Sequence, residues 1–457
     1  MTTTLNHNNE THLSWIGIIR LGLVQTALGA IVVLTTSTLN RIMVVEYALP
    51  AILPGALVGF HYAVQMTRPR WGYGSDIGGR RTPWIIGGLT ILALGGFLAA
   101  IATAIMSSHF VAGLITSILA FLLIGIGVGA SGTSLLTLLA TRVSPRRRPA
   151  AASIVWIMMI AGFVITAIAA GSQLDPYSPE RLVVVSGCVS LTALVVAILA
   201  VYGLEGHTKN RLAPQQKPSA KPDFKKAFFE VWNEPKARQF TIFVFVSMLA
   251  YSAQDLILEP FAGLIFNFTP GESTKLAGVQ NGGVMSGMIL VAIAGSAIGG
   301  KRFGSMRFWA VGGCLASALA FVGLAIAPTF SDTWPLRLNV FFLGFANGAF
   351  AVAAIGSMMG LANHGVAKRE GTRMGLWGAA QAVAFGLGGF LGTVAVDVAR
   401  AIMDAPANAY TVVFAGEAIL FIISALIAWQ VAPNEALKRQ ESCEMAPGPS
   451  EVLQLGE

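Results

Sequence analysis

Charged residues are scarce in this chain of 457 residues: Asp, Glu, Lys and Arg make up 11% of it, whereas 54% of its residues are hydrophobic. Soluble domains carry about 25% charged residues. So little charge cannot cover a surface that faces water, which excludes an ordinary soluble domain. The apolar residues instead form blocks of about 20, the length at which a helix spans the roughly 30 Å hydrocarbon core of a bilayer.

Cysteine and metal-binding motifs are scarce as well. Two of the three cysteines, Cys188 and Cys314, lie in apolar blocks and Cys443 lies in the C-terminal tail, so no disulfide framework is expected. No HExxH, CxxC or paired-histidine spacing appears, and we predict no protein-held metal. The seven aspartates form no cluster of the kind that holds Mg²⁺ with a diphosphate, so no catalytic residue is assigned and we expect that the chain is not an enzyme.

Twelve apolar blocks predict the fold class, an all-α membrane protein with twelve transmembrane helices in two six-helix halves. The expected parts are an N-terminal tail (1–16), a first half (17–203), a linker with an amphipathic helix (204–237), a second half (238–431) and a C-terminal tail (432–457). The blocks lie near residues 19–39, 49–66, 84–106, 110–140, 150–172, 182–203, 238–262, 281–299, 308–329, 336–361, 372–396 and 410–431.

Positive charge is distributed unevenly between the segments that connect these blocks. With the N-terminus placed in the cytoplasm, 25 of the 30 Lys and Arg residues fall on the cytoplasmic side and five on the other. This asymmetry follows the positive-inside rule, so both termini and the linker are expected to be cytoplasmic. The net charge of +8 therefore reflects membrane topology and does not indicate a nucleic-acid partner.

The two halves share weak internal matches. "GRRTPWIIGG" (79–88) aligns with "GSMRFWAVGG" (304–313) at an offset of 225, and "GIGVGA" (125–130) aligns with "GFANGA" (344–349) at an offset of 219. "LNRIMVVE" (39–46) loosely matches "AQDLILE" (253–259). Together these matches favour two halves related by pseudo-symmetry, as in many transporters.

The segment "GYGSDIGGRRTP" between the second and third blocks is the most specific short motif. Gly72, Asp76, Gly79, Arg80 and Arg81 fit the pattern G-x3-D-x2-G-R-R, which resembles the loop signature of the major facilitator superfamily. Glycines permit a tight reversal between two helices. We expect the aspartate to cap a helix or to pair with arginines and so to hold the cytoplasmic side closed.

A stripe of polar residues runs along the seventh apolar block. Its residues recur at every fourth position: Ser247, Tyr251, Asp255 and Glu259. In a helix they form one stripe that winds gradually around the axis, with Gln254 beside it. Charged residues inside membrane helices face the interior of the bundle or a cavity. The stripe therefore predicts a cavity or its gate, and a structural ion pair is the alternative.

Arg41 is the expected partner of this stripe. The repeat match places Arg41 opposite Asp255 at an offset of 214, near the periplasmic end of both helices. We predict that Arg41 pairs with Asp255 or Glu259 and closes the two halves on that side. A local pair between Arg41 and Glu46 is the alternative, and Pro260 is expected to end or kink the seventh helix.

Small residues and one histidine complete the candidates. Gly125, Gly129 and Gly132, with Gly388 and Gly392, are expected to let helices pack closely. His61 in the second block could ligate a metal or the magnesium of a tetrapyrrole through its imidazole, with Gln65 one turn away on the same face. A hydrogen bond from His61 to a neighbouring helix is the alternative.

Several longer segments resemble the PucC family: "TLNRIMVVE" (38–46), "RPRWGYGSD" (68–76), "SMLAYSAQDLILEPFAG" (247–263) and "ESTKLAGVQNGG" (272–283). The resemblance runs over roughly residues 10–435. It implies the major facilitator fold and the inner, intracytoplasmic photosynthetic membrane of a phototrophic bacterium. It also implies a role in assembling light-harvesting complexes through bacteriochlorophyll or its apoproteins.

We therefore expect a membrane protein that binds bacteriochlorophyll or a precursor and delivers it to light-harvesting or reaction-centre subunits, beside bacteriochlorophyll synthase. His61, Gln65, Tyr251 and Gln254 are the candidate pigment contacts, and no covalent cofactor is expected. One alternative is a proton-coupled secondary transporter of a small organic solute, with a carboxylate of the seventh helix as its proton site. Another is a pigment-free chaperone for light-harvesting apoproteins. In all three cases the surrounding partner is the membrane lipid.

Overall fold

The computed structural model describes residues 13–67, 80–144, 147–205, 232–294, 305–362, 370–403 and 405–431. All regular structure in these residues is helical. Three residues of the loop motif, Gly72, Asp76 and Gly79, lie outside the described residues, as does most of the predicted amphipathic helix. The roles expected for these segments stay predictions.

The described residues form twelve main helical segments in the predicted order, which confirms the fold class. Eleven of them are long and apolar enough to span a membrane, and the twelfth is α3. The first half contains α1 (Trp15–Val33), η1 (Leu34–Thr38), α2 (Leu39–Arg41), η2 (Ile42–Glu46), α3 (Ile52–Gln65), α5 (Thr82–Met106), α6 (Phe110–Arg142), α7 (Arg148–Gly171) and α8 (Pro179–Val201). The second half contains α10 (Pro235–Phe266), α11 (Pro270–Ala294), α13 (Met306–Ile326), η5 (Ala327–Phe330), α14 (Leu336–Ala362), α15 (Glu370–Ile402) and α16 (Pro406–Val431).

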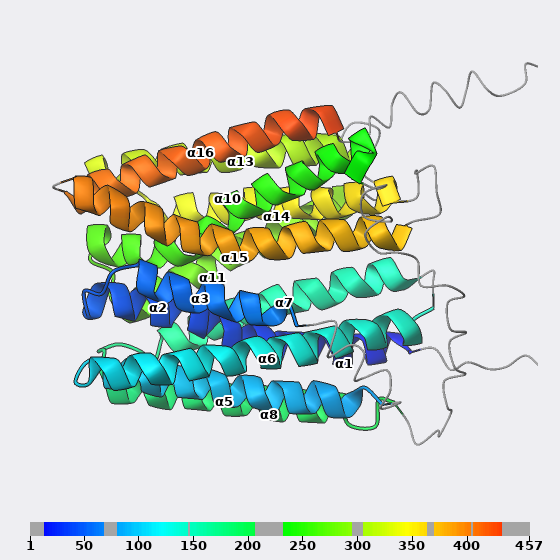
Figure 1. Ribbon diagram of the computed structural model, residues 1–457, viewed down its shortest axis with the longest axis horizontal. Coiled ribbons are helices and arrows are strands. Elements are labelled where there is room, and N and C mark those ends of the chain that lie inside the picture. The colour runs from blue at the N-terminus through cyan, green and yellow to red at the C-terminus, as the bar shows by residue number, and fades with distance from the viewer. Residues whose placement is uncertain are drawn as a thin grey trace, which may run out of the picture.

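Six short connections gather at one end of the helix bundle, which we call the short-loop end (left in Figure 1). They are residues 47–51, 107–109, 172–178, 267–269 and 331–335, together with the connection between α15 and α16. The predicted topology places this end on the periplasmic side. Figure 1 shows the first half, blue to teal, beside the second half, green to red, with the helices of both running roughly along the long axis.

Each half has its own apolar core. One cluster of buried residues belongs to α10 through α16, and another belongs to α1 through α8, joined from the second half by Leu256 of α10. Between the halves, α7 packs against α11 and α3 packs against α15. These two contacts are equivalent under the internal repeat, because α7 and α15 are the fifth helices of their halves and α3 and α11 are the second.

Close backbone approach explains most of the glycines singled out in the sequence. A Cβ on Gly392 would stand 2.8 Å from the Ala253 carbonyl oxygen of α10, and one on Gly125 would stand 2.7 Å from the His61 carbonyl oxygen of α3. Gly388 packs against α10 in the same way. The prediction was wrong for Gly132, where a Cβ would meet only a leucine methyl group 4.0 Å away.

The seventh membrane helix does not end at its proline. Helix α10 runs through Pro260 and ends at Phe266, and Asn267 then adopts a left-handed backbone with φ of 57°. The last part of the polar stripe therefore lies well inside the helix, one turn or more before the short-loop end.

Candidate functional site

The first membrane helix departs from α-helical geometry where it reaches the other half. Two π-helical turns, η1 and η2, flank the three residues of α2. Such turns are rare, and they are frequently found at functional sites. The hydroxyls of Thr35 and Thr36 both donate to the Val32 carbonyl, at 2.9 and 3.0 Å. The turns bring Asn40 and Arg41, both buried, to the boundary with α10.

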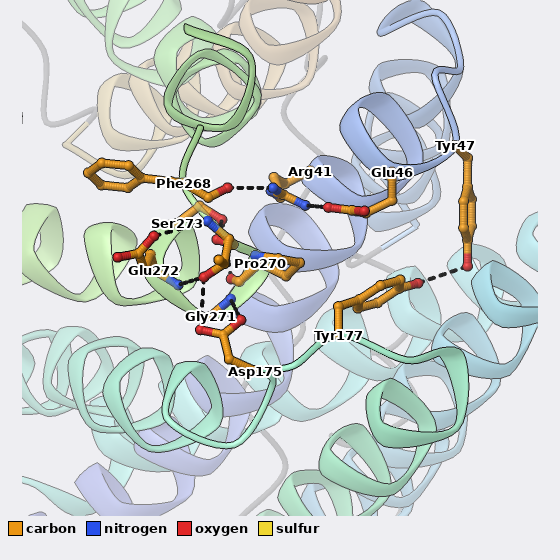
Figure 2. Close-up of polar contacts among 11 residues, drawn as sticks. Arg41, Glu46, Tyr47, Asp175, Tyr177, Phe268, Pro270, Gly271, Glu272 and Ser273 are labelled. Atoms are coloured by element: carbon orange, nitrogen blue, oxygen red, sulfur yellow. Dashed lines mark hydrogen bonds and ion pairs between the residues drawn. The ribbon is translucent and has the colours of Figure 1, made fainter. Parts of the chain in front are cut away.

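Arg41 forms an ion pair with Glu46 (Figure 2). This is the local pair that the sequence offered as the alternative. The predicted pair between Arg41 and Asp255 or Glu259 was wrong: no ion pair joins these described residues. Five residues along an α-helix rotate a side chain by about 140°, which would point Glu46 away. The wider π turn η2 returns Glu46 to the face that carries Arg41.

Arg41 nevertheless connects the two halves at the short-loop end. Its Nη2 donates to the backbone carbonyl of Phe268 in the α10–α11 connection, at 2.6 Å (Figure 2). The guanidinium lies against Gly263, where a Cβ would stand 3.2 Å from Nε. The predicted closure between the halves is therefore present at Arg41, but a carbonyl oxygen accepts the contact instead of a carboxylate.

The two ends of the polar stripe of α10 differ in hydrogen bonding. Ser247 is buried and donates to the Phe243 carbonyl of its own helix at 2.7 Å. Glu259 is 2% exposed, and neither carboxylate oxygen has a hydrogen bond of normal geometry, although Ser37 and Arg41 are near it. The amide of Gln254, 0% exposed, lacks partners at both atoms within the described residues. Buried polar groups without partners are rare in folded proteins, and a functional role is one of the explanations for them.

Four aromatic rings form a row that crosses from one half to the other. Tyr62 of α3 lies 6.2 Å from Phe385 of α15, measured between ring centroids. Phe385 lies 5.7 Å from Tyr251 of α10, which lies 6.4 Å from Phe350 of α14. These separations fall in the range of favourable aromatic contacts. Tyr251 thus joins the stripe to this row, and Asp255 lies one turn further along α10.

His61 lies next to the start of the aromatic row. It is 2% exposed, its ring centroid is 4.2 Å from that of Tyr62, and its ring lies edge-on to Phe121 of α6. Its Nδ1 lies 2.6 Å from the Val58 carbonyl oxygen one turn earlier in the same helix. This bond differs from the predicted alternative, which placed a partner on a neighbouring helix. Gln65 is buried one turn further along α3, and ligation by either residue stays a prediction.

A polar pocket of about 840 Å³ opens between the halves at the short-loop end. Side chains of both charges and from both halves line it, so the pocket is polar and of mixed charge. The lining residues are Arg41, Glu46, Asp175, Pro176, Tyr177, Gly263, Asn267, Phe268, Thr269, Pro270, Glu272 and Lys275.

Two tyrosines support one wall of this pocket. The hydroxyls of Tyr47 and Tyr177 are 2.9 Å apart and form a hydrogen bond between the η2–α3 and α7–α8 connections (Figure 2). Burial raises the pKa of both phenols above the ordinary value for tyrosine. Both hydroxyls therefore keep their protons at neutral pH, and the bond between them is maintained.

Two residues of the loop motif lie within the described chain, at the end opposite the short-loop end. Arg80 is exposed, whereas Arg81 is buried and its Nη1 donates to the Thr137 carbonyl at 2.8 Å and to the Thr141 hydroxyl at 2.6 Å. The carboxylate of Glu205 accepts the backbone N–H of Arg81 at 2.9 Å and so caps the start of α5. These contacts tie α5, α6 and the end of α8 together.

Sequence reasoning missed several polar residues that the structure singles out. Asp175 and Lys275 line the pocket, and Asp397 accepts hydrogen bonds from the other half. Glu417 is buried in α16 with one carboxylate oxygen unpartnered. The available signal for Glu417 was a single acid inside an apolar block. The two aspartates gave no signal, because their partners are backbone groups that lie far away in the sequence.

Comparison with known proteins places the chain in a family. The family model described as "PUCC protein" matches residues 38–436. The "Bacteriochlorophyll synthase 44.5 kDa chain" of Rhodobacter capsulatus is 53% identical over 427 residues, which cover 93% of this chain and 98% of that protein. "Protein PucC" of Rhodobacter capsulatus is 30% identical, over 90% of this chain and 91% of that protein.

Solved structures with the same fold are transporters. A mutant form of the peptide transporter POT, in complex with alafosfalin, has a TM-score of 0.66 at 16% identity and covers 93% of this chain and 96% of its own. A mutant form of the nucleoside transporter NupG has a TM-score of 0.66 at 13% identity. The match covers 91% of this chain and 100% of the NupG chain. Identities this low show the fold alone. The chain is a multi-span membrane protein that belongs to the PucC family and has the fold of the major facilitator transporters.

Proposed function

We propose that this protein binds bacteriochlorophyll or a precursor within the membrane and delivers it to light-harvesting or reaction-centre subunits as they assemble. One observation carries the proposal: the chain is 53% identical, over nearly its full length, to a protein named as a chain of bacteriochlorophyll synthase. Membership of the PucC family supports the role in assembly that the sequence resemblance implies.

The chain is proposed to handle pigment and not to carry out the synthase reaction. A prenyl-transfer reaction on a diphosphate needs clustered carboxylates around Mg²⁺. In this chain Asp175 and Asp397 are instead engaged by backbone N–H groups of the opposite half. The proposed position beside the synthase would let a pigment pass from the enzyme to the carrier without crossing water.

The boundary between the halves supports a pigment site there. The row of aromatic rings from Tyr62 to Phe350 crosses this boundary, and aromatic rings are side chains that pack well against a macrocycle. His61 at one end of the row supplies an imidazole, an ordinary ligand for a metal ion, and its Nδ1 is held by a backbone carbonyl. Gln65, Tyr251 and Gln254 are proposed to provide further polar contacts.

The proposed location is the inner, intracytoplasmic photosynthetic membrane, with both termini and the linker in the cytoplasm. The 25-to-5 distribution of basic residues supports this orientation. It places the short-loop end and its pocket on the periplasmic side. A carrier in this orientation would exchange pigment laterally with membrane partners, since the pigment itself is apolar.

A proton-coupled transporter is the second candidate, and one observation favours it. Glu259 is buried in α10 without a hydrogen bond of normal geometry, and buried carboxylates in membrane helices commonly relay protons. In this case a gradient-driven uptake assay in vesicles would detect a soluble solute. A carrier of pigment should show no such uptake.

Pigment titration of the purified protein tests the proposal. The chain is produced in a host that makes no bacteriochlorophyll, placed in lipid nanodiscs, and titrated with bacteriochlorophyll while the long-wavelength absorption band is recorded. We expect a saturable band shift at about one pigment per protein. His61→Phe should weaken binding about tenfold or more, whereas the exposed His109→Phe should not.

Two results would contradict it. A titration indistinguishable from empty nanodiscs would remove the pigment-carrier function. Co-purification with light-harvesting apoproteins from a pigment-free strain, without any band shift, would favour the pigment-free chaperone instead.

A further inference from the structure

An aspartate of the second half caps a helix of the first half at the short-loop end. Asp397 lies near the end of α15, and its two carboxylate oxygens accept the backbone N–H groups of Ala51 at 3.1 Å and Ile52 at 2.7 Å. These groups begin α3 and have no partner inside that helix. The carboxylate satisfies them and lies at the positive end of the helix dipole.

An aspartate of the first half makes the reciprocal contact. Asp175 lies in the α7–α8 connection, and its carboxylate accepts the backbone N–H of Gly271 at 3.0 Å and the hydroxyl of Thr269 at 2.8 Å (Figure 2). Both donors belong to the first turn of α11 or the residue before it. A Cβ at position 271 would overlap the Asp175 carboxylate, so the glycine is what permits this approach.

The internal repeat relates these two contacts. Asp397 follows Asp175 by 222 residues and Gly271 follows Ala51 by 220, within the 214 to 225 range of the sequence matches between the halves. Each capped helix is the second of its half, and each has a proline at or just before its start, Pro50 or Pro270. One contact therefore closes the α3–α15 boundary and the other closes the α7–α11 boundary.

Both contacts depend on how the halves sit against each other. Each joins a carboxylate of one half to a helix terminus of the other, so neither survives if the halves separate at this end. Their backbone partners would then be exposed to water, and each capping contact would be lost. Arg41 adds a link of another kind between the halves at this end, since its guanidinium donates to the Phe268 carbonyl.

We propose that Asp175 and Asp397 are a pair of symmetry-related latches that hold the two halves together at the short-loop end. Opening the pocket toward the buried stripe from this side then requires both latches to break. The proposal rests on the contacts between the halves and holds whether the cargo is a pigment or a soluble solute.

Distances between spin labels test the latches. In the full-length protein with its three cysteines replaced by alanine, nitroxide labels are placed at the exposed Ser108 and Thr329, one in each half at the short-loop end. A second pair at the exposed Ala140 and Gln430 reports on the opposite end. Electron–electron resonance then gives the distance distribution of each pair in nanodiscs.

Alanine at either latch should move the short-loop pair toward longer distances. We expect the ratio of long to short populations to rise about fivefold for Asp175→Ala or Asp397→Ala, and about 25-fold for the double variant, as for the loss of one or two caps of typical strength. Asparagine at either position should retain most of the short population, since its carbonyl oxygen still accepts a hydrogen bond. Asp332→Ala, an exposed aspartate at the same end, is the matched control and should change nothing.

Three outcomes would overturn the proposal. The first is a double variant whose short-loop distances equal those of the unmodified protein. The second is an equal change in Asp332→Ala. The third is equal broadening at both ends of the molecule, which would indicate general loosening of the fold. If the double variant does not fold, the single alanine variants and their asparagine counterparts decide the question in the same way.

Discussion

At the scale of single residues, the pairing of Arg41 shows what a sequence pattern can and cannot supply. The sequence predicts that a buried arginine near the end of the first helix needs an acidic partner, and it has one. The repeat pointed to α10, but the partner is Glu46, because the π turn η2 changes the number of residues per turn. Nothing in the letters "NRIMVVE" indicates a π turn, so the choice between the two partners could not be made from the sequence.

Neutralising Glu46 tests this pairing. Arg41 is 2% exposed, so Glu46→Gln would leave a buried charge without its counter-ion. We expect a loss of about 2 kcal/mol in the free energy of unfolding, less than the roughly 3–5 kcal/mol of a fully buried pair, because the Glu46 side chain is 30% exposed. An SDS titration of the purified protein in mixed micelles measures this loss.

Glu180→Gln is the matched control, an exposed glutamate in the first turn of α8 at the same end. It should cost less than about 1 kcal/mol, the usual contribution of a charge near a helix terminus. If Glu46→Gln costs no more than Glu180→Gln while Glu259→Gln costs much more, the counter-ion of Arg41 is the carboxylate of α10 after all.

At the scale of elements, helix packing follows from small residues at close crossings. Helices α5 and α6 approach so closely that a Cβ on Gly127 would stand 2.5 Å from the Leu92 backbone nitrogen and 2.7 Å from the Gly88 carbonyl oxygen. The sequence predicted the type of packing, because "GIGVGASG" is rich in small residues. The sequence could not tell which glycines of that run lie at a close helix crossing, because this depends on which neighbouring helix each one faces.

Alanine substitutions within this run test the packing. Gly127→Ala would push the backbone of α6 away from the backbone of α5. We expect it to lower the free energy of unfolding by about 2–3 kcal/mol. Gly132→Ala lies on the same helix, where the added Cβ would meet only a leucine methyl group 4.0 Å away, so it should be neutral or stabilising by up to about 1 kcal/mol, because alanine favours helix more than glycine does. Equal effects of the two substitutions would contradict the close α5–α6 crossing. The same SDS titration measures both.

At the scale of the whole molecule, the twelve helices and the two related halves could be predicted from block length and internal matches. Both signals are local in the sequence, and bilayer thickness fixes the length of each block. The contacts that join the halves could not be predicted in this way. Asp397 and Ala51 are far apart in the chain, and a backbone N–H carries no signature in the sequence.

Reporter fusions test the orientation of the whole molecule. With both termini and the linker on the cytoplasmic side, a cytoplasmic reporter fused after residue 210 or after residue 440 should be active, and alkaline phosphatase fused at the same points should be inactive. A fusion within residues 331–335 at the short-loop end should give the opposite pattern. Active phosphatase after residue 210 would reverse the orientation or change the number of spans.

The central claim is that the protein carries bacteriochlorophyll or a precursor, and one absorbance spectrum tests it most directly. The chain is purified from the photosynthetic membrane of its native phototroph in mild detergent, free of light-harvesting subunits, and its near-infrared spectrum is recorded beside a protein assay. We predict a bacteriochlorin band that co-elutes with the protein at near one pigment per chain and falls in the His61→Phe variant at equal protein yield. A colourless protein at full yield, with the band eluting elsewhere, would contradict the account.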